Sequence, residues 1–391
     1  MMKKLEDVLS IIMKLGGVQL SENIELSNCL DRILAKDIVS DINMPPFDKS
    51  AVDGFACKST DIKKELEIIE TIPAGKVPEK KVETGQCARI MTGAPIPEGT
   101  DCVIMKEDTE TFGKRMKILK SPDKSNICYL GEDVKKGDKV LVKGTLLAPQ
   151  HLSILATVGC INPLVFKKPK VSVIVSGNEI VEPGLTPEPS KIRNSNGTQL
   201  LNQLIKAGCE PYYIGIIDDD VKLLRNAISK AYLQSNILII TGGASKGDFD
   251  LIPATLNKTG FKTYFTEVAI QPGKPFSFST KENLFCFGLS GNPVSSYIQF
   301  EVIVKPFLYR MAGRSKIIFP LKVPIGEYIS RKKTEREYYF PVKFSEEFKA
   351  IPVEFHGSAH IMSLTEADGI AQIPVGIKEI KEGELVNVRP I

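Results

Sequence analysis

The feature that most constrains the fold is a repeated order of apolar run, polar loop and helical pattern. The apolar run at 237–240 leads into Thr241-Gly242-Gly243. A second run at 284–287 leads into a loop that ends in Gly291-Asn292, followed by a long helical pattern. Short apolar runs that alternate with helical patterns are typical of a mostly parallel sheet flanked by helices. The sequence therefore predicts an α/β sheet.

Two further apolar runs end in loops of the same kind. The run at 171–175 leads into Ser176-Gly177-Asn178-Glu179, and the run at 212–217 leads into Asp218-Asp219-Asp220. Helical patterns follow at 197–207, 221–232 and 295–309. In an open α/β sheet such loops gather along the carboxyl edge of the strands, where ligands bind. We therefore expect one site built from four loops.

The residues of these loops favour an anionic ligand. Glycine lets backbone N–H groups approach an anion closely, and Asp248 and Asp250 are spaced to hold a magnesium ion beside a phosphate. Asn292 is a good N-cap and Pro293 suits the first helical position, so an anion also fits that helix start. The alternative interpretation is that the two aspartates are solvated or cap a following helix.

Composition sets the broad class. A chain of 391 residues, 42% hydrophobic and 25% charged, predicts a globular protein of two or more domains. No apolar stretch is long enough to span a membrane and no signal peptide is recognisable, so we expect a cytoplasmic protein that does not bind membranes. The net charge of +4 comes from scattered basic pairs, which argues against nucleic-acid binding. Eight dispersed cysteines indicate a reducing compartment.

Other parts of the chain have different patterns. Apolar spacing predicts an amphipathic helix over 5–15 that ends at Gly16-Gly17. Short alternating segments broken by glycine and proline predict a compact β domain over 46–145, and a helix is expected at 150–158. The tail, 320–391, has many short β-like runs and predicts a small β domain.

Several long motifs resemble one known family. They are the segments 45–56 (PPFDKSAVDGFA) and 89–97 (RIMTGAPIP), the two glycine-rich loops, and 367–370 (ADGI). In this order and over nearly the whole chain they resemble the molybdopterin molybdenumtransferase family, which includes bacterial MoeA and the E domain of gephyrin.

The resemblance implies a multidomain α/β fold with a MogA-like molybdopterin-binding domain at its centre. It implies a helical domain I over 1–45 plus 146–168, and a β domain II inserted over 46–145. An α/β molybdopterin-binding domain III over 169–315 and a C-terminal β-barrel domain IV over 316–391 complete the chain.

The resemblance also implies a reaction. The family takes adenylylated molybdopterin (molybdopterin-AMP), inserts molybdate at its dithiolene and releases AMP with the help of Mg²⁺. It works as a homodimer, and its partners include the molybdopterin adenylyltransferase before it and the acceptors of finished cofactor after it. Two other functions stay open on the residues alone: the adenylyltransferase itself, whose α/β domain is similar, and a non-catalytic cofactor carrier or scaffold.

Residue roles follow from the matching positions. The implied metal ligands are Asp248, Asp250 and Glu179. Lys274, together with Asp248, is an implied catalytic residue, and Gln271 stands where the family usually has a second lysine. Asp53, Thr92 and Asp133 match positions that reach into the active site of the partner subunit, although on sequence alone each could be a turn or cap residue. The implied cofactor-binding residues are Gly242, Gly243, Ser245, Gly247, Pro275, Gly291, Asn292, Ser295 and Asp220; Asp220 could equally be an ordinary helix start.

Overall fold

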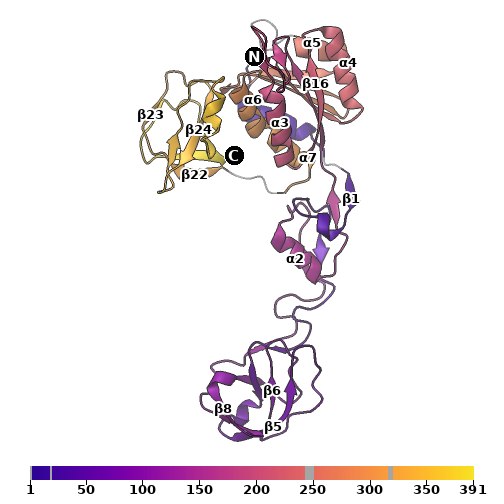
Figure 1. The fold of residues 1–391 in the computed structure, drawn as a ribbon, viewed down its shortest axis with the longest axis vertical. Helices are drawn as coiled ribbons and strands as arrows, with labels where there is room; N and C mark the ends of the chain where they lie inside the picture. Colours follow the sequence, from indigo (N-terminus) through magenta and orange to yellow (C-terminus); the bar gives the residue numbers. More distant parts are fainter. Residues whose placement is uncertain (1, 18–19, 243–250, 316–319) are drawn as a thin grey trace.

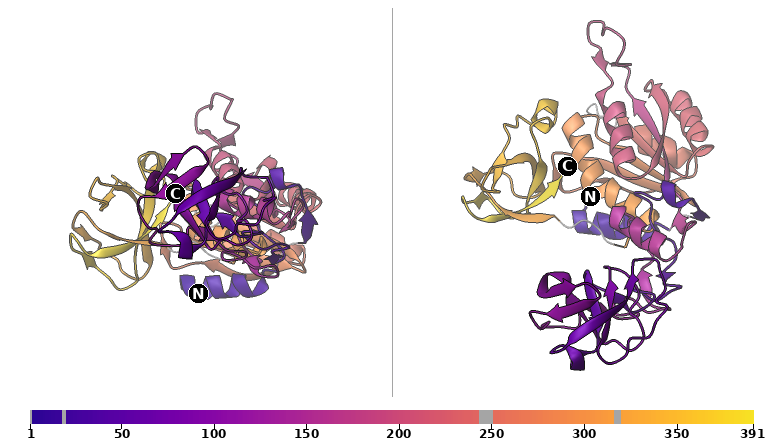
Figure 2. Two further views of the ribbon diagram at one scale, coloured as in Figure 1. Left: turned by 90° about the horizontal axis from the view of Figure 1, so that it is seen from below. Right: turned by 60° about the horizontal axis from the view of Figure 1, so that its bottom comes forward.

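The computed structural model describes residues 2–17, 20–242, 251–315 and 320–391, and it is elongated (Figure 1). We name four parts: the α/β body (170–315 with the helix at 5–15), the C-terminal β body (320–391), the neck (20–45 and 134–168) and the distal β body (46–133). The α/β body and the C-terminal β body lie side by side at one end, and the neck separates them from the distal β body (Figures 1 and 2). Within the described ranges, no helix has the length and apolar character needed to cross a membrane.

The sheet of the α/β body has six strands in the spatial order β16-β13-β17-β21-β20-β18. The first four are parallel, and β20 and β18 continue the sheet in antiparallel fashion. The central strands are buried on both faces, which explains why their sequences are continuous apolar runs. The bounds are β13 Lys170–Ser176, β16 Glu210–Ile217, β17 Ile237–Gly242, β18 Lys262–Glu267, β20 Pro275–Lys281 and β21 Leu284–Leu289.

Helices cover both faces of this sheet. One face packs against α1, α3, α6 and α7, and the other against α4 and α5. The predicted helix at 295–309 is one continuous helical run in three parts, with a π-helical segment, η5, between α6 and α7. The bounds are α1 Leu5–Leu15, α3 Ser195–Lys206, α4 Val221–Tyr232, α5 Leu251–Lys258, α6 Pro293–Gln299, η5 Phe300–Val304 and α7 Lys305–Met311.

The first helix packs away from its neighbours in the sequence. The buried side chains of α1, Leu5, Val8 and Ile12, belong to the core of the α/β body. The backbone of Lys3 also forms a parallel bridge with Val268. The apolar face of α1 therefore finds its partners in the α/β body, whereas the chain that follows it builds the neck.

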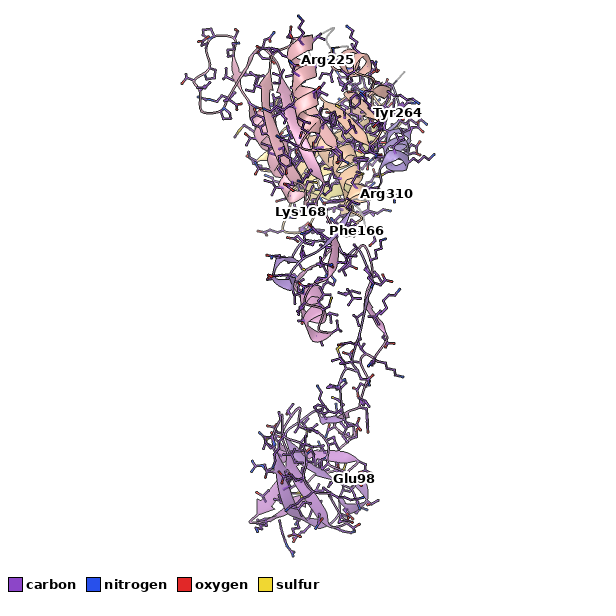
Figure 3. All side chains as sticks on the ribbon, turned by 90° about the vertical axis from the view of Figure 1, so that its right-hand side faces the viewer. Glu98, Phe166, Lys168, Arg225, Tyr264 and Arg310 are labelled. Atoms are coloured by element: carbon purple, nitrogen blue, oxygen red, sulfur yellow. The ribbon has the colours of Figure 1, made fainter. Side chains whose placement is uncertain are left out.

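The neck and the distal β body are small units, and each has a hydrophobic core of its own. In the neck, β1 Ser21–Asn23 pairs with β12 Leu164–Phe166, β2 Ile38–Val39 pairs with β11 Lys139–Leu141, and η1 Leu26–Asn28 and α2 Pro149–Thr157 complete it. Phe166 and Lys168 lie where the neck meets the α/β body, and Glu98 lies in the distal β body (Figure 3). The distal β body is a six-stranded sheet in the order β7-β4-β6-β5-β9-β8, with the pair β3–β10 beside it. Its elements are β3 Lys49–Ser50, β4 Gly54–Cys57, η2 Ser59–Asp61, β5 Glu65–Ile72, β6 Gln86–Ile90, β7 Cys102–Met105, η3 Lys106–Asp108, β8 Thr109–Phe112, β9 Arg115–Ile118 and β10 Ile127–Cys128.

The C-terminal β body shares one strand with the α/β body. Its sheet runs in the order β19-β24-β26-β28-β22, and β19 comes from the α/β body. The register pairs Ile270 with Glu337 and Gln271 with Tyr338. The segment that leads to Lys274 is therefore held by both bodies. The bounds are β19 Ile270–Gln271, β22 Leu321–Pro324, β23 Ile329–Ser330, β24 Glu337–Phe344, β25 Ala350–Pro352, η6 Ile361–Leu364, β26 Gly369–Ile373, β27 Glu379–Ile380 and β28 Leu385–Pro390.

Candidate functional site

A polar cavity of about 390 Å³ lies between the α/β body and the C-terminal β body. Three segments form it: the loop Gln271 to Pro275 after β19, the loop from Ser290 into α6, and residues of the C-terminal β body. The cavity brings together four residues predicted from the sequence, Lys274, Pro275, Asn292 and Ser295. Its other lining residues are Gln271, Pro272, Gly273, Ser290, Arg336, Tyr338, Phe355, Gly357 and Ser358.

The charged side chains among the described lining residues of this cavity are cations. Lys274 and Arg336 line it, and none of its described lining residues is a carboxylate. Lys274 Nζ lies 2.7 Å from Glu267 Oε1, with the two side chains 44% and 40% exposed. Within the part of the chain that the structure describes, the Arg336 guanidinium makes only long hydrogen bonds, 3.4 Å to the carbonyl oxygen of Ile270 and 3.5 Å to Gln271 Oε1. Two cations with spare N–H donors suit an oxyanion.

The start of α6 differs from the expectation in one respect. Asn292 occupies the N-cap position, but its side chain makes no capping hydrogen bond, so the predicted side-chain cap is wrong. The amide of Val294 instead donates to the carbonyl oxygen of Ser358, 3.0 Å away, in the C-terminal β body. That acceptor replaces the cap, and it leaves Asn292 exposed at the cavity while Ser295 is buried.

A buried network that was not predicted from the sequence holds the loop before α6. Thr241 Oγ1 donates to the carbonyl oxygen of Ser290 at 3.0 Å. Asn196 Nδ2 donates to Thr241 Oγ1 at 3.0 Å and to the carbonyl oxygen of Gly291 at 2.8 Å. The end of β17 is therefore tied to the cavity loop through side chains. The only sequence signal was that polar residues stand beside strongly apolar runs.

The strand ends at the carboxyl edge lie close together. Gly242 has φ +112, and a Cβ there would lie 1.8 Å from the carbonyl oxygen of Ser176, so glycine permits β17 to approach β13. Ser176 Oγ donates to Asp219 Oδ1 at 2.7 Å, and the amide of Asp219 donates to Asn178 Oδ1 at 3.0 Å. The loops after β13 and β16 are thus joined as expected for one edge of the sheet.

The expected metal ligands are only partly described. Glu179 is exposed on the loop after β13. Asp248 and Asp250 lie outside the described residues, as do Gly243, Ser245 and Gly247. Among the residues that are described, no group of three or more histidine, cysteine, aspartate or glutamate side chains could hold a metal ion.

Asp220 caps a helix. Its Oδ1 accepts hydrogen bonds from the amides of Lys222 at 2.8 Å and Leu223 at 2.9 Å, at the start of α4. The sequence allowed two roles for Asp220, cofactor binding and an ordinary helix start, and this geometry is that of the helix start. The carboxylate has a second oxygen, so the cap does not itself exclude a contact with substrate.

We expect Asp220→Ala to destabilise the start of α4, whereas Asp220→Ser keeps a cap. Loss of an N-cap costs about 1 kcal/mol, so the amides of Lys222 and Leu223 should exchange with solvent roughly fivefold faster in the alanine variant. Hydrogen exchange measured by mass spectrometry checks this. Equal exchange in the two variants would contradict the cap. Loss of substrate binding in the serine variant, which keeps the cap, would show that the second oxygen has a separate role.

The three remaining predicted residues lie in other parts of the molecule. Asp53 Oδ1 accepts hydrogen bonds from the amide and the hydroxyl of Thr92, each at 2.8 Å, so these two residues form one unit in the distal β body. These bonds, with Lys106 farther away, lower the pKa of Asp53 from its usual value. Asp133 is exposed where the distal β body meets the neck. Within one chain the neck separates the distal β body from the α/β body and the C-terminal β body, whose residues line the cavity (Figure 1).

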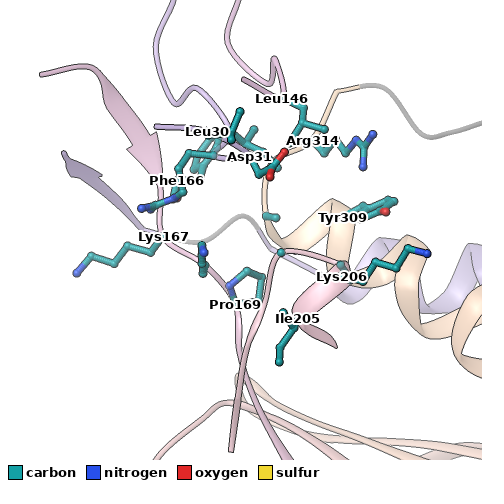
Figure 4. A pocket seen from close by; sticks show the side chains of 16 residues that line it. Leu30, Asp31, Leu146, Phe166, Lys167, Pro169, Ile205, Lys206, Tyr309 and Arg314 are labelled. Carbon is teal, nitrogen blue, oxygen red and sulfur yellow. The ribbon is translucent and has the colours of Figure 1, made fainter. Parts of the chain in front are cut away.

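A second cavity, of about 480 Å³, lies where the neck meets the α/β body (Figure 4). It has several basic lining residues, but the charged end of Lys167 points away from those of Lys206 and Arg314 (Figure 4). The Arg314 guanidinium instead lies 4.3 Å from the ring centroid of Tyr309. None of the residues predicted from the sequence lines this cavity, so we assign the functional site to the first one.

The chain matches three family models in order. The model described as "MoeA N-terminal region (domain I and II)" matches residues 3–159, "Probable molybdopterin binding domain" matches 172–310, and "MoeA C-terminal region (domain IV)" matches 323–391. A protein of Bacillus subtilis (strain 168) named molybdopterin molybdenumtransferase is 35% identical, over 94% of this chain and 89% of its own length. A protein of the same name from Staphylococcus aureus (strain N315) is 33% identical, over 93% and 90%.

Solved structures agree with these matches. The molybdopterin biosynthesis moeA protein from Pyrococcus horikoshii OT3 is 30% identical, with a TM-score of 0.88 over 100% of both chains. A molybdenum cofactor biosynthesis protein from Pyrococcus furiosus is 21% identical with a TM-score of 0.65, which shows the fold alone. The predicted multidomain α/β fold, with a molybdopterin-binding domain at its centre, is therefore confirmed.

Proposed function

Because the chain belongs to the molybdopterin molybdenumtransferase family, and is thus a transferase of molybdenum cofactor biosynthesis, we propose that it inserts molybdate into adenylylated molybdopterin and releases AMP. The observation that carries this proposal is the cavity lined by Lys274, Arg336 and Ser295, with no carboxylate among its described lining residues. Molybdate is a tetrahedral dianion, and two cations beside a hydroxyl group complement it.

Lys274 and Ser295 hold molybdate in this proposal. The lysine sits on a loop stiffened by Pro272 and Pro275, and Ser295 lies on the first turn of α6 across the cavity. Gln271 leaves this loop one lysine short of the family pattern, and Arg336, which is hydrogen-bonded to Gln271 from the C-terminal β body, supplies a second positive charge. The cavity therefore has two positive charges to balance the two negative charges of molybdate.

The pterin substrate occupies the adjoining edge of the sheet. The loop from Gly291 to Asn292 cradles the pterin phosphate, with Gly242, Gly243, Ser245 and Gly247 completing the cradle by their backbone N–H groups. Asn196 donates a hydrogen bond to the carbonyl oxygen of Gly291, which supports the proposal that this loop is ordered before substrate binds. Asp220 lies at the same edge and can contact substrate through its second carboxylate oxygen.

Asp248, Asp250 and Glu179 would hold Mg²⁺ at the phosphoanhydride. The register pairs Ser176 with Gly242, so the loop that carries Glu179 begins beside the loop that carries both aspartates, and hard carboxylate oxygens are the ligands Mg²⁺ prefers. When bound, the ion neutralises charge on the phosphoanhydride as AMP leaves.

The chain itself contributes positioning and charge. Lys274 and Arg336 hold the oxyanion against the dithiolene. As the two sulfurs bond to molybdenum, one oxo ligand leaves as water with the two thiol protons, and a water molecule cleaves the phosphoanhydride to AMP and the pterin phosphate. No covalent bond to the enzyme forms. The reaction is accelerated because the cations are preorganised and the two substrates are held in a fixed relative orientation. The role of Asp248 is to bind the metal, and that of Ser295 is to donate a hydrogen bond to the oxyanion.

The proposal includes a homodimer of four-domain chains, divided at 45/46, 145/146, 168/169 and 315/316. The distance between the distal β body and the cavity supports it, because Asp53, Thr92 and Asp133 can complete a site only if that site belongs to a second copy. The adenylyltransferase that makes the substrate and the acceptors that receive finished cofactor are the expected partners of this dimer.

The test is AMP release from adenylylated molybdopterin with Mg²⁺, with and without molybdate. We expect release that depends on molybdate and that Asp248→Asn abolishes. Consumption of ATP with unadenylylated molybdopterin would instead indicate an adenylyltransferase. Tight binding of the pterin with no AMP release under any condition would indicate a carrier and would refute the catalytic roles given above.

A further inference from the structure

Gln299 is a fully buried amide directly behind the cavity. It is the last residue of α6, its side chain has no exposed area, and it does not line the cavity. It is nevertheless bonded to both loops that do. Its Oε1 accepts a hydrogen bond from the amide of Ser290 at 2.9 Å, and its Nε2 donates to the carbonyl oxygens of Gly273 at 2.8 Å and Pro275 at 2.6 Å.

The partners fix the orientation of this amide. The only acceptor atom of the side chain faces an N–H group, and its only donor group faces two carbonyls, so the reverse orientation would oppose like groups at all three contacts. Gly273 has φ +107, and a Cβ there would lie 3.1 Å from Gln299 Cγ and Nε2. Glycine at 273 therefore lets the loop approach the glutamine closely.

The two carbonyls that Gln299 binds flank Lys274. The carbonyl oxygen of Lys274 itself accepts from the amide of Val268 at 2.9 Å, so three consecutive carbonyls of this loop are held. On the other wall, Ser290 is held at its amide by Gln299 and at its carbonyl by Thr241. One buried side chain thus joins the segment that carries the cation to the segment that leads into Ser295.

We propose that Gln299 is a positioning residue for oxyanion binding, which sets the separation of Lys274 from the Ser290–Ser295 wall by bonding to both loops. The assignment of molybdate as the oxyanion rests on the proposed function, whereas the joining of the loops does not. The residue touches no substrate, so its effect is on the affinity of a site whose charges stay in place.

The test compares two replacements of similar length. Gln299→Met breaks all three bonds, and Gln299→Glu keeps an acceptor for the Ser290 amide while losing at least one donor to the other loop. We expect the methionine variant to raise the molybdate KM and the molybdate Kd, measured by calorimetry, by about 10- to 100-fold, with kcat within about threefold. Hydrogen exchange of the Ser290 amide should be faster in the methionine variant and near the unaltered rate in the glutamate variant.

Gln203→Met is the matched control. Gln203 is also a buried glutamine beside the same helical run. Among the described residues its side chain donates to the carbonyl oxygen of Tyr297 at 3.4 Å and to Glu301 Oε1 at 3.0 Å, and so to neither cavity loop. Its replacement should leave the molybdate Kd within about twofold. The proposal is overturned if the Gln299 variants keep the unaltered Kd, or if Ser290 exchange does not separate methionine from glutamate.

Different results would refute the proposed function and the positioning role of Gln299. Lack of molybdate binding and of AMP release by the unaltered protein would refute the proposed function, while the exchange of Ser290 in the Gln299 variants would still report whether the side chain joins the loops. Unaltered activity with unaltered exchange would refute the positioning role alone.

Discussion

Replacing Lys274 with alanine is expected to lower molybdate-dependent AMP release by about 10²- to 10³-fold at subsaturating molybdate. The cavity has only two cations among its described lining residues, and removing one partner of a desolvated, hydrogen-bonded charge pair costs about 2–5 kcal/mol of affinity, which spans this range. Steady-state assays over a range of molybdate concentrations measure the effect. Most of it should appear in KM, because the oxyanion is bound by Lys274 before the dithiolene reacts with it.

Glu267→Gln is the matched control for this variant. It breaks the same ion pair, 2.7 Å between Lys274 Nζ and Glu267 Oε1, but keeps the ammonium group. An exposed pair of this kind is worth about 0–1 kcal/mol, so freeing the lysine should lower the molybdate KM by at most about fivefold and should not raise it. If Glu267→Gln is as damaging as Lys274→Ala, the ion pair has a structural role and Lys274 is not the oxyanion ligand.

Secondary structure in the α/β body could be predicted from the sequence because it depends on local patterns. The helix expected at 221–232 has those bounds in α4, and the apolar run at 237–240 forms the first four residues of β17. Both features depend on burial of periodic apolar residues, which the sequence displays directly. The π-helical segment η5 inside the predicted helix 295–309 has no such local signal.

The cavity could be predicted only in part, since its walls meet through long-range contacts. Lys274 and Ser295 carried recognisable motifs, whereas the pairing of Gln271 with Tyr338 that brings Arg336 to the same cavity depends on a register between two bodies. The side-chain cap expected from Asn292 failed for the same reason, because a carbonyl from the C-terminal β body took that place. Gln299 stood in an apolar helical run with nothing local to indicate its three distant partners.

The distal residues raise a different question, which is whether one chain contains a complete site. Asp53 and Thr92 are hydrogen-bonded to each other, yet the neck separates the distal β body that carries them from the α/β body (Figure 1). Two copies arranged so that each distal β body reaches the other's α/β body would form two identical sites. Each site would then contain Lys274 from one chain and Asp53 from the other.

Mixing two inactive variants is expected to restore activity. In a dimer of one Asp53→Ala chain and one Lys274→Ala chain, one of the two shared sites contains both native residues and the other contains neither. Random exchange of subunits makes half the dimers mixed. At subsaturating molybdate we therefore expect about a quarter of the unaltered AMP release, whereas each variant alone has almost none.

The control mixes Lys274→Ala with Ser295→Ala, whose residues line the same cavity of one chain. Every site in that mixed dimer lacks one of the two residues, so activity should not recover. Recovery in both mixtures would contradict the shared site, because recovery would then not depend on which chain supplies each residue. If neither mixture recovers after subunit exchange has been verified by native mass spectrometry, Asp53 does not act in the site of a second copy, and the hydrogen bonds from Thr92 are then the whole of its role.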